Sequence, residues 1–396
     1  MNKNTHPLSG LLVVALEHAI AAPFCTRQLA DLGARVIKIE RPKHGDFARN
    51  YDDRVKGISS HFAWTNRSKE SLTLDIKTPE GKDILMSLLA KADVFVQNLA
   101  PGATQRLGLS YETLKNSNDQ LIVCDISGYG DSGPYRDKKA YDLLIQSESG
   151  FLSITGTPDE PSKAGCSIAD IAAGMYAYSN ILAALIKRGL TQSGCRIEVS
   201  MLESMVEWMG YPLYYAFEGA EPPERAGASH ATIYPYGLFS GNDQGTIVLG
   251  LQNEKEWALF CNEVLKKPHL LSDERFKTNS ARSEHRSLLK KLIDDVFAQY
   301  SADEIVTLLD KAGIACARVN TLNEVWDHPQ LTARNRWTQI GSPSGALPAL
   351  LPPGIDSADH ANMGPIPGLG QHSRTILTEL AYSDEQIQTL EDNGII

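Results

Sequence analysis

The sequence predicts an α/β protein in which helices cover both faces of a parallel sheet. Two observations lead to this fold class. Over the first 130 residues, short apolar runs of strand type alternate with longer patterns of helical type, which is typical of consecutive β-α-β units. The composition, 42% hydrophobic and 22% charged over 396 residues, is that of a globular protein with two or three domains.

The elements follow in order along the chain. The apolar run 11–16 predicts the first strand, and 24–32 predicts a helix that has Pro23 in its first turn and Gly33 at its end. The same patterns predict strands at 35–40, 94–97, 121–127 and 196–200, and helices at 78–92, 111–116, 169–188 and 202–209.

The character of the sequence changes after about residue 220. Two strand-like runs, 236–239 and 246–251, flank the turn residues 241–245 and predict an antiparallel hairpin. Six prolines and six glycines within 341–370 predict a loop. Helices are predicted at 254–265, 282–299, 302–312 and 375–380, and a last one from Ser383.

Charge and composition exclude several classes of function. The formal net charge is −10, which argues against a nucleic-acid binder or a binder of anionic membranes, because such proteins carry a basic surface. An anionic ligand would therefore be held by local donors. No signal-peptide pattern and no run of 18 apolar residues is present, so a cytoplasmic protein without a membrane partner is expected.

Metal and dinucleotide sites are not supported either. The six cysteines include no CxxC pair, and no histidines are spaced i, i+4, so neither a disulfide framework nor a metal site is expected. Gly128–Gly133 matches GxGxxG after a predicted strand, but the polar run 134–139 follows it instead of an apolar helix. The motif therefore indicates a turn near some ligand rather than a site for NAD.

Asp170 stands at the head of the Ala-rich predicted helix 169–188. Spacing alone favours the simplest interpretation, an acid that stabilises a helix N-terminus by a few tenths to about 1 kcal/mol. The same position would keep the carboxylate ionised, and the small residues 172–174 leave room for a bulky group. An ionised and uncrowded carboxylate is what covalent catalysis by aspartate requires.

Taken as an ordered series, segments along nearly the whole chain resemble the class III CoA-transferases, the CaiB/BaiF family that includes formyl-CoA transferase. The segments that carry the resemblance are Pro23 with 29–34 and 36–42, Gly45-Asp46 and Arg49, 66–77, 98–102 with 106–108, 127–134, Tyr141-Asp142 with Gln146, Asp170 with Gly174, and 181–188.

The resemblance implies a fold and a reaction. It implies a Rossmann-like large domain built from residues 1–221 and 319–396, a smaller α/β domain at 222–318, and an interlaced homodimer. Asp170 would be the nucleophile of a ping-pong reaction through an aspartyl–acyl mixed anhydride and an aspartyl-CoA thioester. Coenzyme A would be a co-substrate, with no tightly bound cofactor and no metal.

The family's CoA contacts, carried over position by position, give a set of expected ligand residues. Within it, Arg41, Lys77, Arg106 and Lys139 supply the cations that CoA phosphates need. The set comprises Ile20, Ala21, Arg41, Leu74, Asp75, Ile76, Lys77, Asn98, Leu99, Ala100, Arg106, Lys139, Ala140, Tyr141 and Asp142.

Two departures narrow the expected activity. Related racemases carry a histidine where this chain has Tyr141, which favours transfer over racemisation. A glycine-rich loop of formyl-CoA transferase is replaced by 227–237, which resembles the branch that moves CoA from succinyl-CoA to dicarboxylic acids such as mesaconate, itaconate or citramalate. Candidates for the acceptor's second carboxylate are Arg49, Arg225 and His230. An acyl-CoA racemase or isomerase and a non-catalytic CoA-binding protein remain the alternatives.

Overall fold

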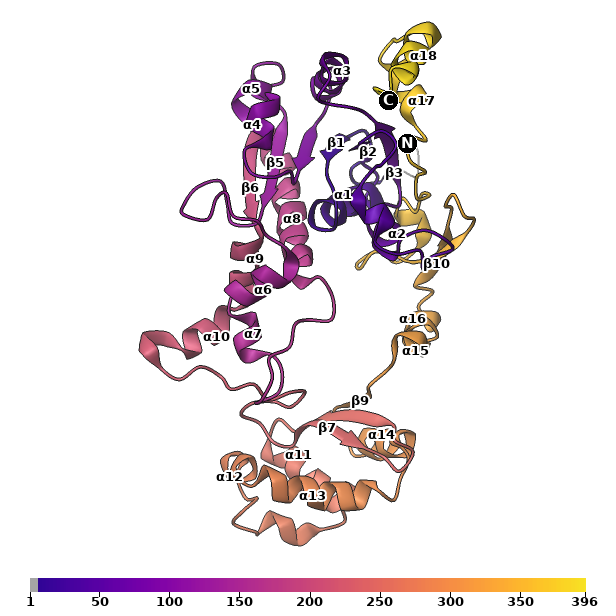
Figure 1. Cartoon of the computed structure of the whole chain (residues 1–396). Coiled ribbons are helices and arrows are strands. Elements are labelled where there is room, and N and C mark those ends of the chain that lie inside the picture. The colour runs from indigo at the N-terminus through magenta and orange to yellow at the C-terminus, as the bar shows by residue number, and fades with distance from the viewer. Residues whose placement is uncertain (1–5) are drawn as a thin grey trace. The chain divides into compact units, whose positions relative to one another are not determined.

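The computed structural model describes residues 6–396, and the chain divides into two compact units (Figure 1). Unit 1 contains the residues up to Phe151, then Ala164–Gly210 and Gln330–Ile396, whereas unit 2 contains Leu152–Lys163 and Tyr211–Pro329. Segments from both ends of the chain thus build unit 1. The sequence places the corresponding boundaries at 221/222 and 318/319.

Unit 1 is organised around a six-stranded sheet in the order β3-β2-β1-β4-β5-β6, and every neighbouring pair is parallel. This confirms the predicted α/β class with a parallel sheet. The order is that of a doubly wound nucleotide-binding sheet. The strands are β1 (Leu12–Leu16), β2 (Arg35–Glu40), β3 (Lys69–Thr73), β4 (Val94–Gln97), β5 (Ile122–Ser127) and β6 (Cys195–Ser200).

Alternate residues of the strands face two separate hydrophobic cores. Val13 of β1 lies in the core that contains α1 (Ala21–Asp31) and α8 (Ile168–Thr191). Its neighbour Val14 lies in the core formed with α3 (Pro79–Leu89), α17 (Ser373–Glu379) and α18 (Asp384–Asp392). Both faces of the sheet are therefore covered, as the apolar strands require, and the C-terminal helices complete the second face.

The remaining elements of unit 1 connect and flank this sheet. They are η1 (Phe47–Asn50), α2 (Ser60–Thr65), α4 (Ala103–Leu107), α5 (Tyr111–Lys115), α6 (Asp142–Glu148), α9 (Met201–Trp208), β10 (Trp337–Ile340), β11 (Leu347–Leu350) and η5 (Ala358–His360). Three short helices cross the unit boundaries: α7 (Phe151–Ile154), α10 (Gly210–Tyr215) and α16 (Pro329–Ala333).

Unit 2 packs helices against a three-stranded antiparallel sheet in the order β7-β8-β9. The predicted hairpin is present as β7 (Tyr236–Ser240) and β8 (Thr246–Gly250), and β9 (Cys316–Arg318) joins them. The helices are η2 (Phe217–Gly219), α11 (Glu254–Leu259), η3 (Phe260–Val264), η4 (Pro268–Leu271), α12 (Asn279–Glu284), α13 (Arg286–Phe297), α14 (Ala302–Lys311) and α15 (Leu322–Trp326).

The expectation of a loop at 341–370 is wrong in part. β11 lies within this segment and pairs antiparallel with β10, so that Leu347 is opposite Ile340. Leu347 and Ala349 are buried while Pro348 between them is exposed, which is the alternation of a half-buried strand. A two-stranded ribbon tolerates Pro348 because each strand has a free edge, and the density of proline and glycine hides this pattern in the sequence.

The predicted helix 282–299 is also interrupted. It is divided at His285, where α12 ends and α13 begins.

Helix α8 is the one helix, among the residues described, that is long and apolar enough to cross a membrane by length and composition. Its small side chains Ala169, Ala172, Ala173 and Ala177 are buried in the first core, where α8 packs closely on α1. This packing is that of a core helix.

Close approach of α1 to α8 depends on Gly174. A Cβ atom at this position would lie 2.7 Å from the carbonyl oxygen of Ala21 and 2.9 Å from Cδ1 of Phe24. Because the first of these atoms belongs to the backbone, the contact cannot be relieved by a side-chain rotation. Gly174 therefore sets the distance between the two helices one turn after Asp170.

We predict that Gly174→Ala destabilises unit 1 by about 1–3 kcal/mol, because the added methyl group forces the two helices apart. The matched control is Gly189→Ala in the same helix, where an added Cβ atom would have nothing within 4 Å. That change should leave stability equal or raise it by about 0.5–1 kcal/mol, as expected for glycine to alanine within a helix. Urea unfolding followed by circular dichroism measures both, and equal effects of the two changes would contradict the contact.

Candidate active site

The candidate site lies at the carboxyl ends of β1, β2 and β4. A cavity of about 650 Å³ opens there, between the segment that follows β1 and the segments that follow β2 and β4. Parallel sheets of this strand order bind ligands in the crevice beside the central strand, where connections leave toward opposite faces. Seven of the expected CoA ligands line the cavity: Arg41, Leu74, Asp75, Ile76, Lys77, Leu99 and Ala100.

Cations are gathered at this cavity even though the whole chain is acidic. The exposed side chains of Arg41, Lys43 and Lys77 line it together with His44. Arg41 donates from Nε and one terminal nitrogen to the carbonyl oxygen of Gly45, at 3.3 and 3.1 Å. This contact orients the guanidinium at the rim of the cavity, an arrangement suited to phosphate.

A second cavity, of about 540 Å³, shares Leu99 and Ala100 with the first. It lies at the carboxyl ends of β4, β5 and β6 and contains the ion pairs of Arg196 with Asp125 and Asp131. Arg106 of α4 is exposed at the edge of this region, where it donates to the carbonyl oxygen of Pro101 at 3.5 Å.

The other expected CoA ligands have distinct positions. Asn98 accepts the N–H of His18 at 3.0 Å and donates to its carbonyl oxygen at 2.9 Å, so its amide joins the ends of β1 and β4. Lys139 and Tyr141 are exposed in the segment before α6, and Ala140 packs against Gly128 of the GxGxxG match. Ile20 and Ala21 stand at the start of α1 and are buried.

Asp170 is the third residue of α8, in its first turn. Two groups from other elements bear on its carboxyl. The backbone N–H of Ala21 lowers its pKa, and the charge of Asp142, the first residue of α6, raises it. Asp142 also caps α8, because its Oδ1 accepts the N–H of Ala169 at 2.8 Å.

The ionisation of Asp170 differs from the sequence-based expectation. Burial and, next, the charge of Asp142 raise the pKa of the Asp170 carboxyl to about 7, and the Ala21 N–H opposes this only in part. The expectation that the helix head keeps this carboxylate fully ionised is therefore wrong for the ligand-free protein. Desolvation outweighs the helix dipole here, and burial of that kind is not readable from local sequence.

Two of the three side chains expected to bind the acceptor's second carboxylate already donate hydrogen bonds to other groups of the protein. The Arg49 guanidinium makes a bidentate pair with Glu40 at 2.8 and 2.7 Å and lies over the ring of Phe62. Arg225, within unit 2, donates to the carbonyl oxygens of Thr157, Ser153 and Pro158.

His230 has a different environment. Its Nδ1 accepts the backbone N–H groups of Thr232 and Ile233, each at 3.1 Å, and its ring stacks on Tyr236. Because Nδ1 accepts, the proton of the neutral ring is on Nε2. The two arginines already donate to groups of the protein, whereas among the residues described the Nε2–H of His230 has no acceptor assigned to it.

Sequence reasoning missed a buried group of charges beneath the site, formed by Glu17, Lys38, Asp46 and Lys69. All four side chains are buried, and they are joined by ion pairs of 2.7 to 3.4 Å. One signal could have revealed them. Lys38 lies between Ile37 and Ile39 in the middle of β2, where a strand of a parallel sheet is buried on both faces, and a buried lysine requires a carboxylate partner.

Tyr51 was also missed. The charges of Asp46, Asp170 and Tyr141 act on its hydroxyl, and together with burial, the largest cause, they raise the pKa of Tyr51 to about 12. Its ring contacts those of Phe47 and His61. The raised pKa thus keeps the phenol protonated.

A family model and the curated relatives of this chain all describe CoA-transferases. The family model described as CoA-transferase family III matches residues 8–373. Succinyl-CoA:glutarate CoA-transferase of Mus musculus is 33% identical over 98% of this chain and 90% of its own. Succinate–glutarate CoA-transferase of Agrobacterium fabrum is 33% identical over 94% of this chain and 96% of its own.

A solved structure agrees in fold. The crystal structure of a CAIB/BAIF family protein from Brucella suis superposes with a TM-score of 0.86 at 35% identity, covering 96% of this chain and all of that one.

We predict that the rate of the reaction initiated by Asp170 rises with pH, with a midpoint near pH 7, because the carboxylate is the nucleophilic form and its pKa is about 7. Asp142→Asn should move the midpoint to lower pH, since it removes a neighbouring negative charge and keeps an oxygen for the Ala169 N–H. The exposed Asp119→Asn is the control and should leave the profile unchanged. A flat profile from about pH 5 to 9 would contradict the assignment.

Proposed function

We propose, from the premise that this chain belongs to CoA-transferase family III, that it moves coenzyme A from a short acyl-CoA such as succinyl-CoA to a dicarboxylic acid, with Asp170 as the nucleophile. The chain is a class III CoA-transferase, and its relatives named above act with succinyl groups and glutarate. The mechanistic proposal rests on the carboxyl of Asp170, which is desolvated and is acted on by the backbone N–H of Ala21. Glu17 and His18, which precede Ala21 in the chain, line the cavity that contains Arg41 and Lys77.

In the first half-reaction, a carboxylate oxygen of Asp170 attacks the carbonyl carbon of the donor thioester. The carbon–sulfur bond breaks, which gives an aspartyl–acyl mixed anhydride and CoA thiolate. The thiolate then attacks the aspartyl carbonyl carbon and releases the donor acid as its carboxylate. The enzyme is left as an aspartyl-CoA thioester.

The second half-reaction repeats these steps with the acceptor. Its carboxylate attacks the aspartyl thioester and expels CoA thiolate, and the thiolate then attacks the acceptor's acyl carbon. The new acyl-CoA leaves and the Asp170 carboxylate is restored. Each addition places negative charge on a carbonyl oxygen, which the N–H of Ala21 is positioned to stabilise when that oxygen belongs to Asp170.

Binding of CoA is assigned to the cavity at β1, β2 and β4. Arg41 and Lys77 would meet its phosphates there, and Arg106 and Lys139 are further exposed cations of the same unit. Phosphate groups gain from such charge-assisted bonds even where the net charge of the protein is negative. For the acceptor, His230 offers the Nε2–H donor described above, whereas Arg49 and Arg225 would first have to leave their present partners.

We further propose that the enzyme is a homodimer. The outer face of α8 exposes Ile186 and Leu190, at 71 and 83%, and in unit 2 Tyr211, Tyr214 and Phe217 are 76, 81 and 64% exposed. Each unit thus exposes large apolar side chains, as proteins do at their interfaces. A second copy of the chain would cover them.

The covalent mechanism predicts that incubation with succinyl-CoA modifies Asp170. Hydroxylamine should convert the aspartyl thioester to a hydroxamate, and borohydride should reduce it, each detectable by mass spectrometry of the peptide that contains Asp170. Asp170→Asn should lower kcat by at least about 10³-fold while binding of CoA persists, because only the nucleophile is lost.

Tests with glutarate, mesaconate, itaconate and citramalate as acceptors complete this experiment. An unmodified peptide together with an active Asp170→Ala enzyme would exclude covalent transfer. Product formed from acyl-CoA without any free acceptor would instead indicate an isomerase.

The dimer proposal predicts a mass of two chains in light scattering after gel filtration. Leu190→Lys places a charge on the exposed apolar face and should raise the dimer dissociation constant at least about tenfold, because the charge must be desolvated on association. The control is Lys187→Glu in the same part of the helix, and a monomeric wild-type protein would contradict the proposal.

A further inference from the structure

The segment Glu17–Pro23, named the Glu17–Pro23 turn here, comprises the four residues that follow β1 and the first three residues of α1, and it contains the backbone N–H of Ala21 that acts on Asp170. Ala19 in this turn has φ +62°, a left-handed conformation that costs energy for a residue with a Cβ atom. Such a conformation persists only where surrounding contacts hold it. Asn98 holds His18 in this turn, and the buried ion cluster of Glu17, Lys38, Asp46 and Lys69 holds the residues on both sides of it.

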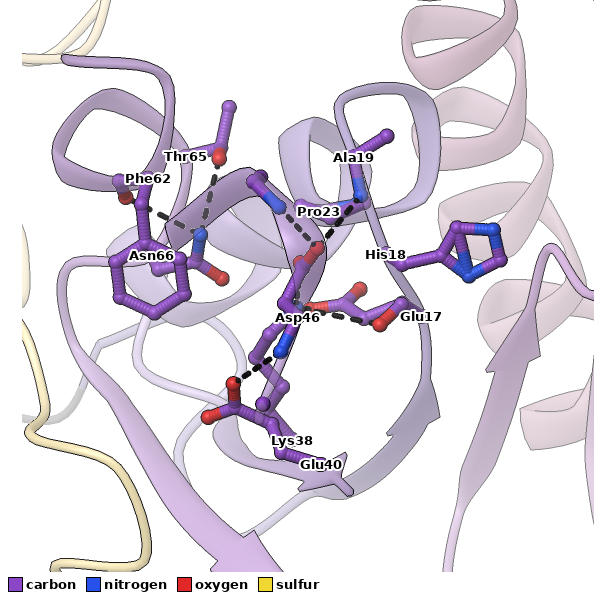
Figure 2. A network of polar contacts seen from close by, with 12 residues as sticks. Glu17, His18, Ala19, Pro23, Lys38, Glu40, Asp46, Phe62, Thr65 and Asn66 are labelled. Carbon is purple, nitrogen blue, oxygen red and sulfur yellow. Dashed lines mark hydrogen bonds and ion pairs between the residues drawn. The ribbon is translucent and has the colours of Figure 1, made fainter. Parts of the chain in front are cut away.

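Each member of the cluster holds one part of the turn. Asp46 Oδ1 accepts the N–H of Ala19 at 3.1 Å, and Figure 2 shows this carboxylate reaching back to the turn while the Asp46 N–H is directed at Glu40. Lys38 Nζ donates to Asp46 at 2.9 Å and lies 3.4 Å from both the carbonyl oxygen and Oε1 of Glu17. Lys69 Nζ donates to the carbonyl oxygen of Pro23 at 3.0 Å.

The charges within the cluster depend on one another. Burial would raise the pKa of the Glu17 carboxyl, but the charges of Lys69 and Lys38 outweigh it, and the pKa is lowered. Burial lowers the pKa of Lys69 to about 8 even against the charge of Glu17. Loss of one charge therefore leaves its partner desolvated without compensation, which is strongly destabilising locally.

The far end of the turn is fixed against Asp170. The carbonyl oxygen of Ala21 packs against Gly174, one helical turn after Asp170 along α8, and the Ala21 N–H acts on the pKa of the Asp170 carboxyl. Little space remains for Ala21 to move toward α8. A shift of the turn would therefore change the direction of this N–H relative to Asp170.

We propose that Lys38 and Asp46 are positioning residues of the transfer reaction, which hold the Glu17–Pro23 turn so that the Ala21 N–H stays directed at the reacting carboxyl of Asp170. The inference rests on the proposed function of Asp170. It explains why a sheet that could be filled with apolar side chains contains two buried lysines, since well-packed apolar residues are often as stable as buried ion pairs.

A second buried ion cluster provides a matched control. Arg67 donates to Asp31 from Nε and a terminal nitrogen, both at 2.8 Å, and Arg27 pairs with the same carboxylate at 2.6 Å. This cluster holds the C-terminal half of α1, whereas the Glu17–Pro23 turn leads into the opposite end of the helix. Arg67→Met thus removes a buried cation from the same unit without releasing the turn.

The experiment compares Lys38→Met with Arg67→Met in the full chain. Both should lower the unfolding midpoint. Lys38→Met alone should lower kcat at least about tenfold while KM for the acyl-CoA donor changes less than about threefold, because the cavity is kept and the reacting group is misaligned. Lys38→Met should also move the ionisation of the Asp170 carboxyl to higher pH, measured by carbon-13 NMR of labelled aspartate, since a hydrogen bond to the charged form is weakened.

Loss of the Lys38 charge does not by itself change the pKa of the Asp170 carboxyl. Beside the Ala21 N–H and burial, Asp142 is the group that acts on the pKa of Asp170. Asp142 stays in place in both variants, as does Tyr51, whose hydroxyl is near Asp170. A shift in Lys38→Met that Arg67→Met does not produce therefore reports movement of the turn.

The proposal is overturned if folded Lys38→Met keeps kcat and the Asp170 ionisation within the range of Arg67→Met. If Lys38→Met does not fold, Asp46→Asn replaces it, because asparagine keeps an oxygen for the Ala19 N–H and loses only the pairing with Lys38. The proposal is then overturned if folded Asp46→Asn keeps kcat and the Asp170 ionisation within the range of Arg67→Met. Absence of CoA transfer in the wild type would refute the proposed function, while the NMR titration still decides the positioning role.

Discussion

Two lysine ammonium groups with no access to solvent determine how the carboxyl end of the central strand is built. Lys38 and Lys69 lie on neighbouring strands, β2 and β3, and their charges meet the single carboxylate of Glu17, the residue that follows β1. Unpaired, any of these charges would cost several kcal/mol by desolvation. The chain after β1 must therefore turn toward the lysines, and its next residues are carried to the start of α1.

The strand order turns this local requirement into a site. β1 pairs with β2 on one side and with β4 on the other, so the segments that leave β1 and β4 diverge and open a crevice between them. Asn98 bridges the two segments through both backbone polar groups of His18. The cavity lined by Arg41 and Lys77 is also lined by Glu17 and His18. The contacts of Glu17 therefore support both the cavity proposed for CoA and the turn that leads to Ala21.

Sequence patterns predict the layers of the fold better than its site. Apolar periodicity finds β1, β2, β4, β5, β6 and the long helix α8, because each buries a continuous or alternating apolar face. It does not find β3, since the sequence Lys69–Thr73 contains two charged residues, and their burial depends on partners distant in sequence. The resemblance points to Asp170 and to seven residues that line the cavity at β1, β2 and β4, but the engagement of Arg49 with Glu40 required coordinates.

The raised pKa of Asp170 comes from burial and from the charge of Asp142, and it has a chemical consequence. A carboxylate that is harder to ionise is also more basic, and a more basic oxygen is the better nucleophile toward a thioester. Placing Asp170 where solvent is largely excluded, beside Asp142, costs part of the ionised fraction near pH 7. The N–H of Ala21 limits this loss, and under the proposed mechanism it would remain available to the aspartyl carbonyl oxygen of the anhydride and of the thioester. Several further donors would stabilise the resting anion and weaken its attack, so a site with one well-held donor serves both stages of the reaction.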